Sequence, residues 1–185
     1  MEFTTAIGSR RSVREYLPQP VKKETLLELI DAAVQAPSAM DEQPWHFTVI
    51  TDKALLARMS KSAKAALLAA SAEGPHLDHI REMLSDPNFN IFYDAGALIV
   101  ISAPRALQWA VEDCALAAQN LMLAAHAQNL GTCWIGFAQA WLDTPEGHAA
   151  IGLDQSLLPV APIIVGVPKK VPAHAPRRKP RVHWL

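Results

Sequence analysis

The stretch that most constrains the fold is residues 105–130, a long segment with helical spacing and almost no charge. After Arg105, its only charged side chains are those of the adjacent Glu112 and Asp113. Large apolar side chains would lie all round such a helix: Trp109, Leu116, Leu121, Met122 and Leu123. A helix that is apolar on nearly every side must be buried on every side. In a chain of 185 residues, this burial is easiest if a second subunit covers one face of the helix.

The rest of the chain alternates between helical and strand-like patterns. Helical spacing is found in the ranges 22–36, 53–71 and, more weakly, 75–90. Apolar and β-branched runs typical of strands occupy the ranges 45–51, 97–102, 132–137 and 161–168. The strands are far apart in the sequence, and no repeat or linker divides the chain. The pattern therefore predicts a single α+β domain over residues 1–185, with a sheet covered by helices.

Charge is segregated along the chain. The composition is 50% hydrophobic with a net charge of -1, which suits one compact domain and argues against a surface coated in basic charge for nucleic-acid binding. Residues 1–23 and 169–185 nevertheless hold 11 of the 17 Lys and Arg but only two of the 18 Asp and Glu. The two chain ends are thus basic and the middle is acidic.

Several classes of site lack their sequence signatures. Neither GxGxxG nor GxxxxGK[ST] occurs, and GxSxG and HExxH are also absent. His76 and His79 could share a helical face, but two ligands rarely make a metal site, so we expect a solvated pair and no metal. Cys114 and Cys133 match no CxxC spacing, which favours buried, inert thiols. Without a signal peptide or membrane span in the pattern, we expect a cytoplasmic protein.

The N-terminal run GSRRSVREY, residues 8–16, is the first candidate site. Arg10 and Arg14 are four residues apart and would share a face if this turn is helical, with Arg11 and Ser12 as further donors. Guanidinium groups offer paired, permanently charged donors that suit a phosphate dianion. A solvated charge run before a helix is the alternative interpretation.

Four motifs together carry a resemblance to a known family. They are RRSVREY, APSAMDEQPWHF, NLGTCWIGF, and VGVP followed by RRKP near the end. In this order they resemble the short form of the FMN-dependent nitroreductase family, and they cover nearly the whole chain. The resemblance implies an α+β fold with a central mixed or antiparallel sheet, a long buried central helix, and an intertwined homodimer that binds two FMN molecules at the subunit interface.

The resemblance also implies cofactor-binding residues. Arg10, Arg11, Ser12 and Arg14 would hold the FMN phosphate, ribityl chain and pyrimidine edge. Arg178 would reach the phosphate from the C-terminal end, and Arg177 or Lys179 could supply a further cation there. From the partner subunit, the ring and ribityl chain would be lined by Ser38, Ala39, Met40 and Gln43. Trp134, Ile135 and Gly136 would run along the isoalloxazine, with a backbone N–H near Ile135 and Gly136 facing N5. Trp134 and Ile135 could instead be core residues, and Gln43 could merely precede a strand.

The implied activity depends on the cofactor and not on a catalytic side chain. Tightly bound FMN would accept hydride at N5 from NADH or NADPH and pass it to a nitroaromatic, a quinone or a similar electron-poor small molecule in a ping-pong cycle. One alternative is a flavin-binding protein that stores or delivers FMN or uses it for non-reductase chemistry. Another is a binding module whose basic ends grip nucleic acid, but the acidic middle and the scarcity of aromatics in the basic tail count against it. We therefore expect no nucleic-acid or membrane partner.

Overall fold

A computed structural model describes residues 1–70, 78–173 and 175–185. Its helices are α1 (Phe3–Ser9), α2 (Lys23–Ala33), the short 3₁₀ helix η1 (Ala39–Asp41), α3 (Lys53–Ala70), α4 (Asp78–Ser85), α5 (Ala110–Ala127), α6 (Gly136–Leu142) and α7 (Pro145–Ile151). Its strands are β1 (His46–Ile50), β2 (Ala97–Pro104), β3 (Gly131–Trp134) and β4 (Leu157–Gly166). Part of the helix expected at 75–90 lies outside the described residues, and α4 is the part that the structure shows.

The strands form one antiparallel sheet in the order β1-β2-β4-β3. Ile99 of β2 pairs with Ile163 of β4, and Cys133 of β3 pairs with Ile164 on the other side of the same strand. β2 and β4 lie at the centre, and β2 is buried along nearly its whole length, as its continuous apolar run predicts. The expected α+β class is confirmed, and the sheet is antiparallel.

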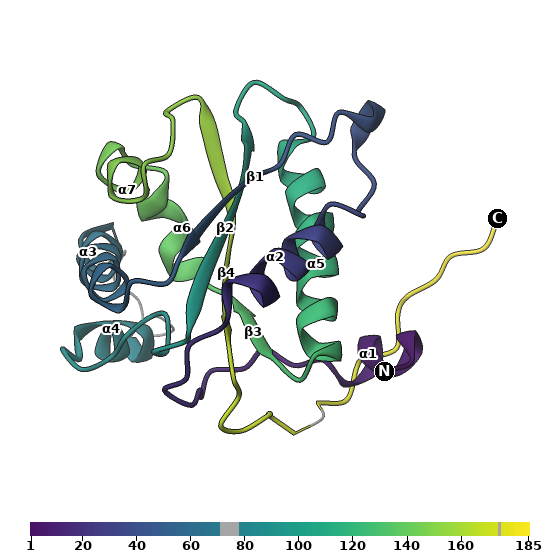
Figure 1. The fold of residues 1–185 in the computed structure, drawn as a ribbon, viewed down its shortest axis with the longest axis horizontal. Helices are drawn as coiled ribbons and strands as arrows, with labels where there is room; N and C mark the ends of the chain where they lie inside the picture. Colours follow the sequence, from purple (N-terminus) through teal and green to yellow (C-terminus); the bar gives the residue numbers. More distant parts are fainter. Residues whose placement is uncertain (71–77, 174) are drawn as a thin grey trace.

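Helices cover both faces of this sheet (Figure 1). Because side chains alternate along a strand, Ile99 and Ile101 of β2 face α2 and α5, whereas Leu98 and Val100 face α3, α4 and α6. Each face therefore buries its own apolar cluster. The molecule has three layers, with α5 lying along one face of the sheet.

Helix α5 is buried on one side only. Its buried residues are mostly small and include Ala117, Ala118 and Ala125, so the helix packs closely on the sheet and on α2. Trp109, just before the helix, is 49% exposed, and Leu116 is 45% exposed. The burial on every side that the sequence requires is thus not achieved within one chain.

The structure differs from the expected elements in several regions. Residues 136–151 form α6 and α7, where no helix was expected, and the strand expected at 132–137 ends at Trp134. Gly131 is the first residue of β3, and Asn129, after α5, adopts a positive φ of 61°. A Cβ at position 131 would lie 2.8 Å from Cβ of Val13, so glycine is needed there for close packing.

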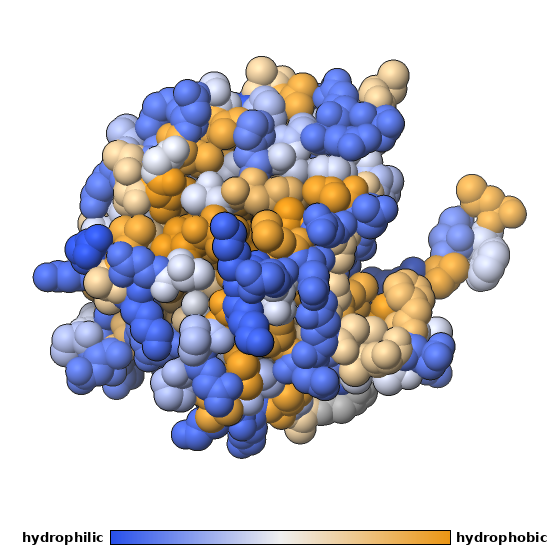
Figure 2. All heavy atoms as spheres, in the orientation of Figure 1, coloured by the Kyte–Doolittle hydropathy of each residue, from blue (hydrophilic) through white to orange (hydrophobic). Residues whose placement is uncertain are grey.

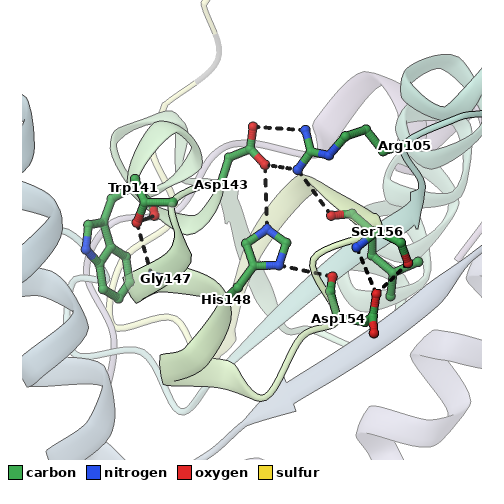
Figure 3. A network of polar contacts seen from close by, with 9 residues as sticks. Arg105, Trp141, Asp143, Gly147, His148, Asp154 and Ser156 are labelled. Carbon is green, nitrogen blue, oxygen red and sulfur yellow. Dashed lines mark hydrogen bonds and ion pairs between the residues drawn. The ribbon is translucent and has the colours of Figure 1, made fainter.

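A polar network ties α6 and α7 to the sheet (Figure 3). Asp143, after α6, forms an ion pair with Arg105, after β2, and lies 3.6 Å from Nε2 of the fully buried His148. His148 Nδ1 lies 3.1 Å from the carbonyl of Asp154, before β4. The network therefore links the ends of β2 and β4 to the helices on one face.

Apolar surface besides that of α5 also remains exposed in the described part of the chain. Figure 2 shows apolar side chains gathered over the region of α2 and β1, where Leu27 and Val49 are exposed. The last part of the C-terminal tail, residues 175–185, runs away from the body past α1 (Figure 1), and its end carries exposed Val182, Trp184 and Leu185. In the described residues, no helix is long and apolar enough to cross a membrane.

Candidate functional site

The N-terminal arginines lie on extended chain and not on a helix. Helix α1 ends at Ser9, and Arg10 already has an extended ψ of 135°. Ser12 forms a parallel bridge with Thr132 of β3, and the amide of Val13 donates to the carbonyl of Thr132 at 2.9 Å. Side chains of extended chain alternate, so positions 10, 12 and 14 face one way and 11 and 13 the other. The condition of a helical turn is thus not met, but Arg10 and Arg14 still share a side of the extended segment.

The thiol of Cys133 lies near the side that Arg10, Ser12 and Arg14 share. Burial raises the pKa of the Cys133 thiol, whereas Arg14, Ser12 and Arg10 each act to lower it. All three side chains therefore surround one buried sulfur at the edge of the sheet. The thiol is buried, as expected, but it lies inside the candidate site and not in a remote part of the core.

The guanidinium of Arg10 has a buried donor without an acceptor in the described residues. Its Nη1 is buried and has no hydrogen-bond partner among the described residues. Burial lowers the pKa of its guanidinium, and the positive charges of Arg11 and Arg177 lower it further. Each of these effects would be relieved by an anion bound here. Arg177 is the tail arginine whose charge acts on Arg10; Arg178, expected in this role, is exposed and is not among the charges that lower the pKa of Arg10.

Arg14 opens onto a hollow of about 340 Å³ between the N-terminal segment and the start of the tail. Ser12 and Lys170 line the same hollow. Arg14 is itself exposed, and its charge and polar contact lower the pKa of Tyr93, which burial otherwise raises. The hollow thus has donors from both basic ends of the chain.

Arg11 lies on the opposite side of the segment. Its Nη1 donates to the carbonyls of Gly8 at 2.9 Å and Arg10 at 2.6 Å. Together with His126 and Val13, it lines a separate hollow of about 150 Å³. Arg11 therefore stays apart from the expected group of Arg10, Ser12 and Arg14, and it closes the end of α1.

The segment Trp134–Gly136 connects β3 to α6. Ile135 is buried, and its amide already donates to the carbonyl of Pro162 at 2.8 Å. Gly136 is exposed, and an added Cβ there would meet nothing within 4 Å. Of the two backbone N–H groups expected to face a ligand, only that of Gly136 has no hydrogen-bond acceptor among the described residues. Trp134 is half-buried against the sheet.

The loop with Ser38, Ala39, Met40 and Gln43 projects from the body near the N-terminus of α5 (Figure 1). Met40, Asp41 and Gln43 have φ values of 52°, 56° and 48°, an unusual conformation for residues other than glycine. Met40 is 91% exposed. Strained backbone and an exposed apolar side chain are typical of functional loops.

Asp113 of α5 holds this loop in place. Its carboxylate accepts a hydrogen bond from the amide of Ala39 at 2.9 Å, and its carbonyl accepts one from Nε1 of Trp45 at 3.0 Å. Asp113 is 3% exposed. Asp113 is thus a buried acidic residue on which the loop depends for a hydrogen-bond acceptor.

The two groups of expected site residues lie at opposite ends of α5. Asp113 anchors the loop at one end, and His126 at the other bonds to Oγ of Ser9, next to Arg10, at 2.7 Å. At a rise of about 1.5 Å per residue, Asp113 and His126 are roughly 20 Å apart along the helix. The structure therefore does not bring Ser38–Gln43 and Arg10–Arg14 together within one chain.

Metal binding finds no support in the part of the chain that the structure describes. No group of three or more His, Cys, Asp or Glu side chains there could hold a metal ion. His79 is exposed, and His76 lies outside the described residues.

Comparison with known proteins identifies the family. The model of the nitroreductase family matches residues 7–167. The chain belongs to the nitroreductase family. Three proteins illustrate its similarity to known nitroreductases. A chain from Methanothermobacter thermautotrophicus, whose name gives NADH dehydrogenase and NAD(P)H nitroreductase as alternatives, is 30% identical over 93% of this chain and 80% of its own length.

The other two are a curated enzyme and a solved structure. The 4-nitrobenzoate reductase of Pseudomonas putida is 27% identical over 71% of each chain. A nitroreductase from Bacteroides fragilis, solved with bound FMN, has a TM-score of 0.80 at 27% identity and covers 100% of this chain and 95% of its own. The fold described above is thus the nitroreductase fold.

Sequence reasoning missed four residues around the site: Cys133, Tyr93, Lys170 and Asp113. Lys170 belongs to the basic C-terminal segment. The basic character of both chain ends was the sequence feature that could have identified it. Cys133 lies directly before the expected Trp134. No sequence pattern indicated a role for Tyr93 or Asp113, because each contacts the site residues across segments far apart in the sequence.

Proposed function

We propose that residues 1–185 form one FMN-binding domain of an oxidoreductase that uses NADH or NADPH to reduce nitroaromatics, quinones or similar electron-poor small molecules. One observation carries the proposal: the buried, unpartnered Nη1 of Arg10 lies among further cations in a nitroreductase fold. The related Bacteroides fragilis protein holds FMN, and curated relatives are named as NAD(P)H nitroreductases.

The donor set fits the phosphate of FMN. Arg10, Ser12 and Arg14 offer guanidinium and hydroxyl donors on one side of the extended segment, and Arg177 adds a charge from the tail. Arginine presents paired donors that match phosphate geometry. We propose Arg177 for the place that the sequence pattern gives to Arg178, with Arg178 as a neighbour on the same tail.

The remaining contacts would orient the ring. Trp134 and Gly136 lie where β3 ends, and the free N–H of Gly136 can donate to a ring nitrogen. When bound, FMN supplies the hydride-transfer chemistry, so no side chain of this chain needs to act as nucleophile. Fixed donors and cations at the site stabilise negative charge on a bound ligand without reorganising.

We further propose a homodimer in which the loop of one chain completes the site of the other. The loop residues Ser38, Ala39, Met40 and Gln43 cannot reach Arg10 of their own chain, since α5 separates them. Exposed apolar side chains on α5 and at the end of the tail are available for contact: Trp109, Val111, Leu116, Val182, Trp184 and Leu185. Burying them between two chains is favourable.

An anaerobic absorbance spectrum tests the activity. We expect the purified or FMN-reconstituted protein to absorb near ~450 nm, to bleach with NADH or NADPH, and to recover on addition of a nitroaromatic or a quinone. Protein that cannot be reconstituted with FMN contradicts the proposal. Bleaching without recovery by any acceptor would support the alternative of a flavin carrier.

A further inference from the structure

Helix α3 and the loop at 86–90 enclose a hollow of about 450 Å³ that is separate from the site above. From α3 it is lined by Ser60, Lys61 and Lys64, and from the loop by Asn88 and Phe89. None of its lining residues belongs to the hollow beside Ser12 and Arg14. A volume of this size is typical of a small-molecule pocket.

Lys64 brings a buried charge to the wall of this hollow. It is 8% exposed, and its Nζ donates to the carbonyls of Asp86 and Phe89, each at 2.7 Å. An ammonium group has three donors, so one remains. Lys64 has no ion pair with any carboxylate of the described residues. A buried cation without an anionic partner is costly.

Ser60, one helical turn before Lys64, supplies a second buried donor. It is 3% exposed, and its Oγ accepts from the amide of Ile91 at 3.0 Å. Its hydroxyl hydrogen has no acceptor within the described part of the chain. Residues four apart share a helix face, so both unused donors belong to the wall of one hollow.

The lining of the hollow is partly polar and partly apolar. Lys61 adds an exposed charge one turn before Lys64, and Asn88 adds a side-chain amide. The carboxylate of Asp86 accepts a hydrogen bond from the backbone N–H of Asn88 at 2.8 Å. Apolar surface comes from Ala57, Pro87 and the ring of Phe89, whose centroid lies 5.9 Å from Nζ of Lys64.

We propose that this hollow is a binding site for a small organic carboxylate. The anionic head binds the free donors of Lys64 and Ser60 with support from Lys61, and the apolar body packs on Phe89 and Pro87. The mixed wall favours an organic anion over inorganic phosphate. This site goes beyond the proposed function, because it uses no residue of the cofactor site.

Titration of ¹⁵N-labelled, FMN-loaded protein with benzoate tests the proposal by NMR. We expect saturable shifts at the backbone amides of Asn88 and Phe89 and at the side-chain amide of Asn88. Benzyl alcohol, the neutral match, leaves these signals in place, and inorganic phosphate moves them less. Shifts confined to Trp134 and Gly136, no saturation, or equal binding of inorganic phosphate would each overturn the proposal.

Substitutions in the hollow test which side chains contribute to benzoate binding. Lys61→Met and Ser60→Ala each weaken benzoate binding by about fivefold, in the range expected for a partly exposed charge or a hydrogen bond. The matched controls on the same helix are Arg58→Met and Ser62→Ala, which lie outside the hollow and leave the affinity unchanged. Equal effects of variants and controls would contradict the site. If FMN does not load, titration of the apoprotein still tests the hollow, so this result is independent of the proposed cofactor.

Discussion

The Arg10 guanidinium combines three unfavourable features in the isolated chain. It is partly buried, it lies near the like charges of Arg11 and Arg177, and its Nη1 has no acceptor in the described residues. Folding tolerates such a group where a ligand later compensates for it. Arg11, its neighbour in sequence, already has two carbonyl acceptors. The two adjacent arginines therefore differ in what they can offer an anion.

This difference gives the first prediction. Arg10→Ala weakens FMN binding by on the order of 1.5 to 3 kcal/mol, the range of a charge-assisted hydrogen bond. Arg11→Ala, the matched control, has a clearly smaller effect because its guanidinium faces away. Fluorescence titration of the apoprotein with FMN measures both. Equal losses in the two variants would show that the phosphate is held elsewhere.

Asp143 gives a second prediction, on stability against pH. The Arg105 hydrogen bond, opposed by burial, lowers the pKa of Asp143 below the ordinary 3.8, so its charged form stabilises the folded state. This contribution is present above the unfolded pKa and is lost as the pH falls through the lower folded pKa.

Urea unfolding of the Asp143→Asn variant measures how much the charged Asp143 side chain contributes to the free energy of unfolding. Both partners are partly exposed, so we expect a loss of at most about 1 kcal/mol at pH 7. The difference from wild type shrinks as the pH falls below about 4, where the carboxylate takes up a proton. Glu28→Gln, on the exposed side of α2, serves as control. A difference that persists unchanged at low pH would contradict the assigned ion pair.

At the scale of elements, periodicity identified most helices and strands but not the short ones. Helices α2, α3 and α5 have enough turns for their apolar spacing to show. Helix α7 has seven residues, and its signals are local: Thr144 caps it, Pro145 begins it, and Gly152 ends it with a φ of 64°. β4 begins at Leu157, before the expected 161, because Pro159 and Pro162 obscure the strand pattern.

In the N-terminal segment, two different local structures place the same two arginines on one side of the chain. A spacing of four puts Arg10 and Arg14 on one side of a helix and also on one side of extended chain. Only the extended form, fixed by pairing with β3, brings Ser12 to the same side. That pairing joins residues about 120 apart in sequence, which no local pattern reveals.

The loop at 38–43 depends on helix α5, which leads to a third prediction. Asp113→Ala leaves the amide of Ala39 without its acceptor and lowers the free energy of unfolding by about 1 to 3 kcal/mol. Glu112→Ala, the adjacent exposed carboxylate, changes it by no more than about 0.5 kcal/mol. Urea denaturation of both variants provides the measurement. Similar values for the two would mean that the loop does not depend on Asp113.

At the scale of the whole molecule, the single chain leaves apolar surface unburied. The exposed side of α5 and the end of the tail are far from each other in the sequence but both lie outside the core clusters. The sequence predicted that α5 needs a cover beyond its own chain, because its composition is apolar on every side. Which surface supplies that cover could not be predicted, since it depends on an arrangement of chains.

A fourth prediction follows for assembly. Leu116→Glu places a charge on the exposed apolar side of α5 and raises the dimer dissociation constant by on the order of tenfold or more. Gln119→Glu adds the same charge at an exposed polar position of the helix and has little effect. Sedimentation equilibrium compares the two with wild type. A wild-type chain that stays monomeric at all concentrations would contradict the proposed dimer.

The separation of the two residue groups along α5 has a genetic consequence. If each site takes its arginines from one chain and its loop from the other, a defect in either group disables both sites of a dimer. Co-expression of an Arg10 variant with a loop variant would give mixed dimers in which both defects fall in one site and the other site is intact. Two inactive alleles would then complement each other, restoring up to half of the activity in the mixed molecules.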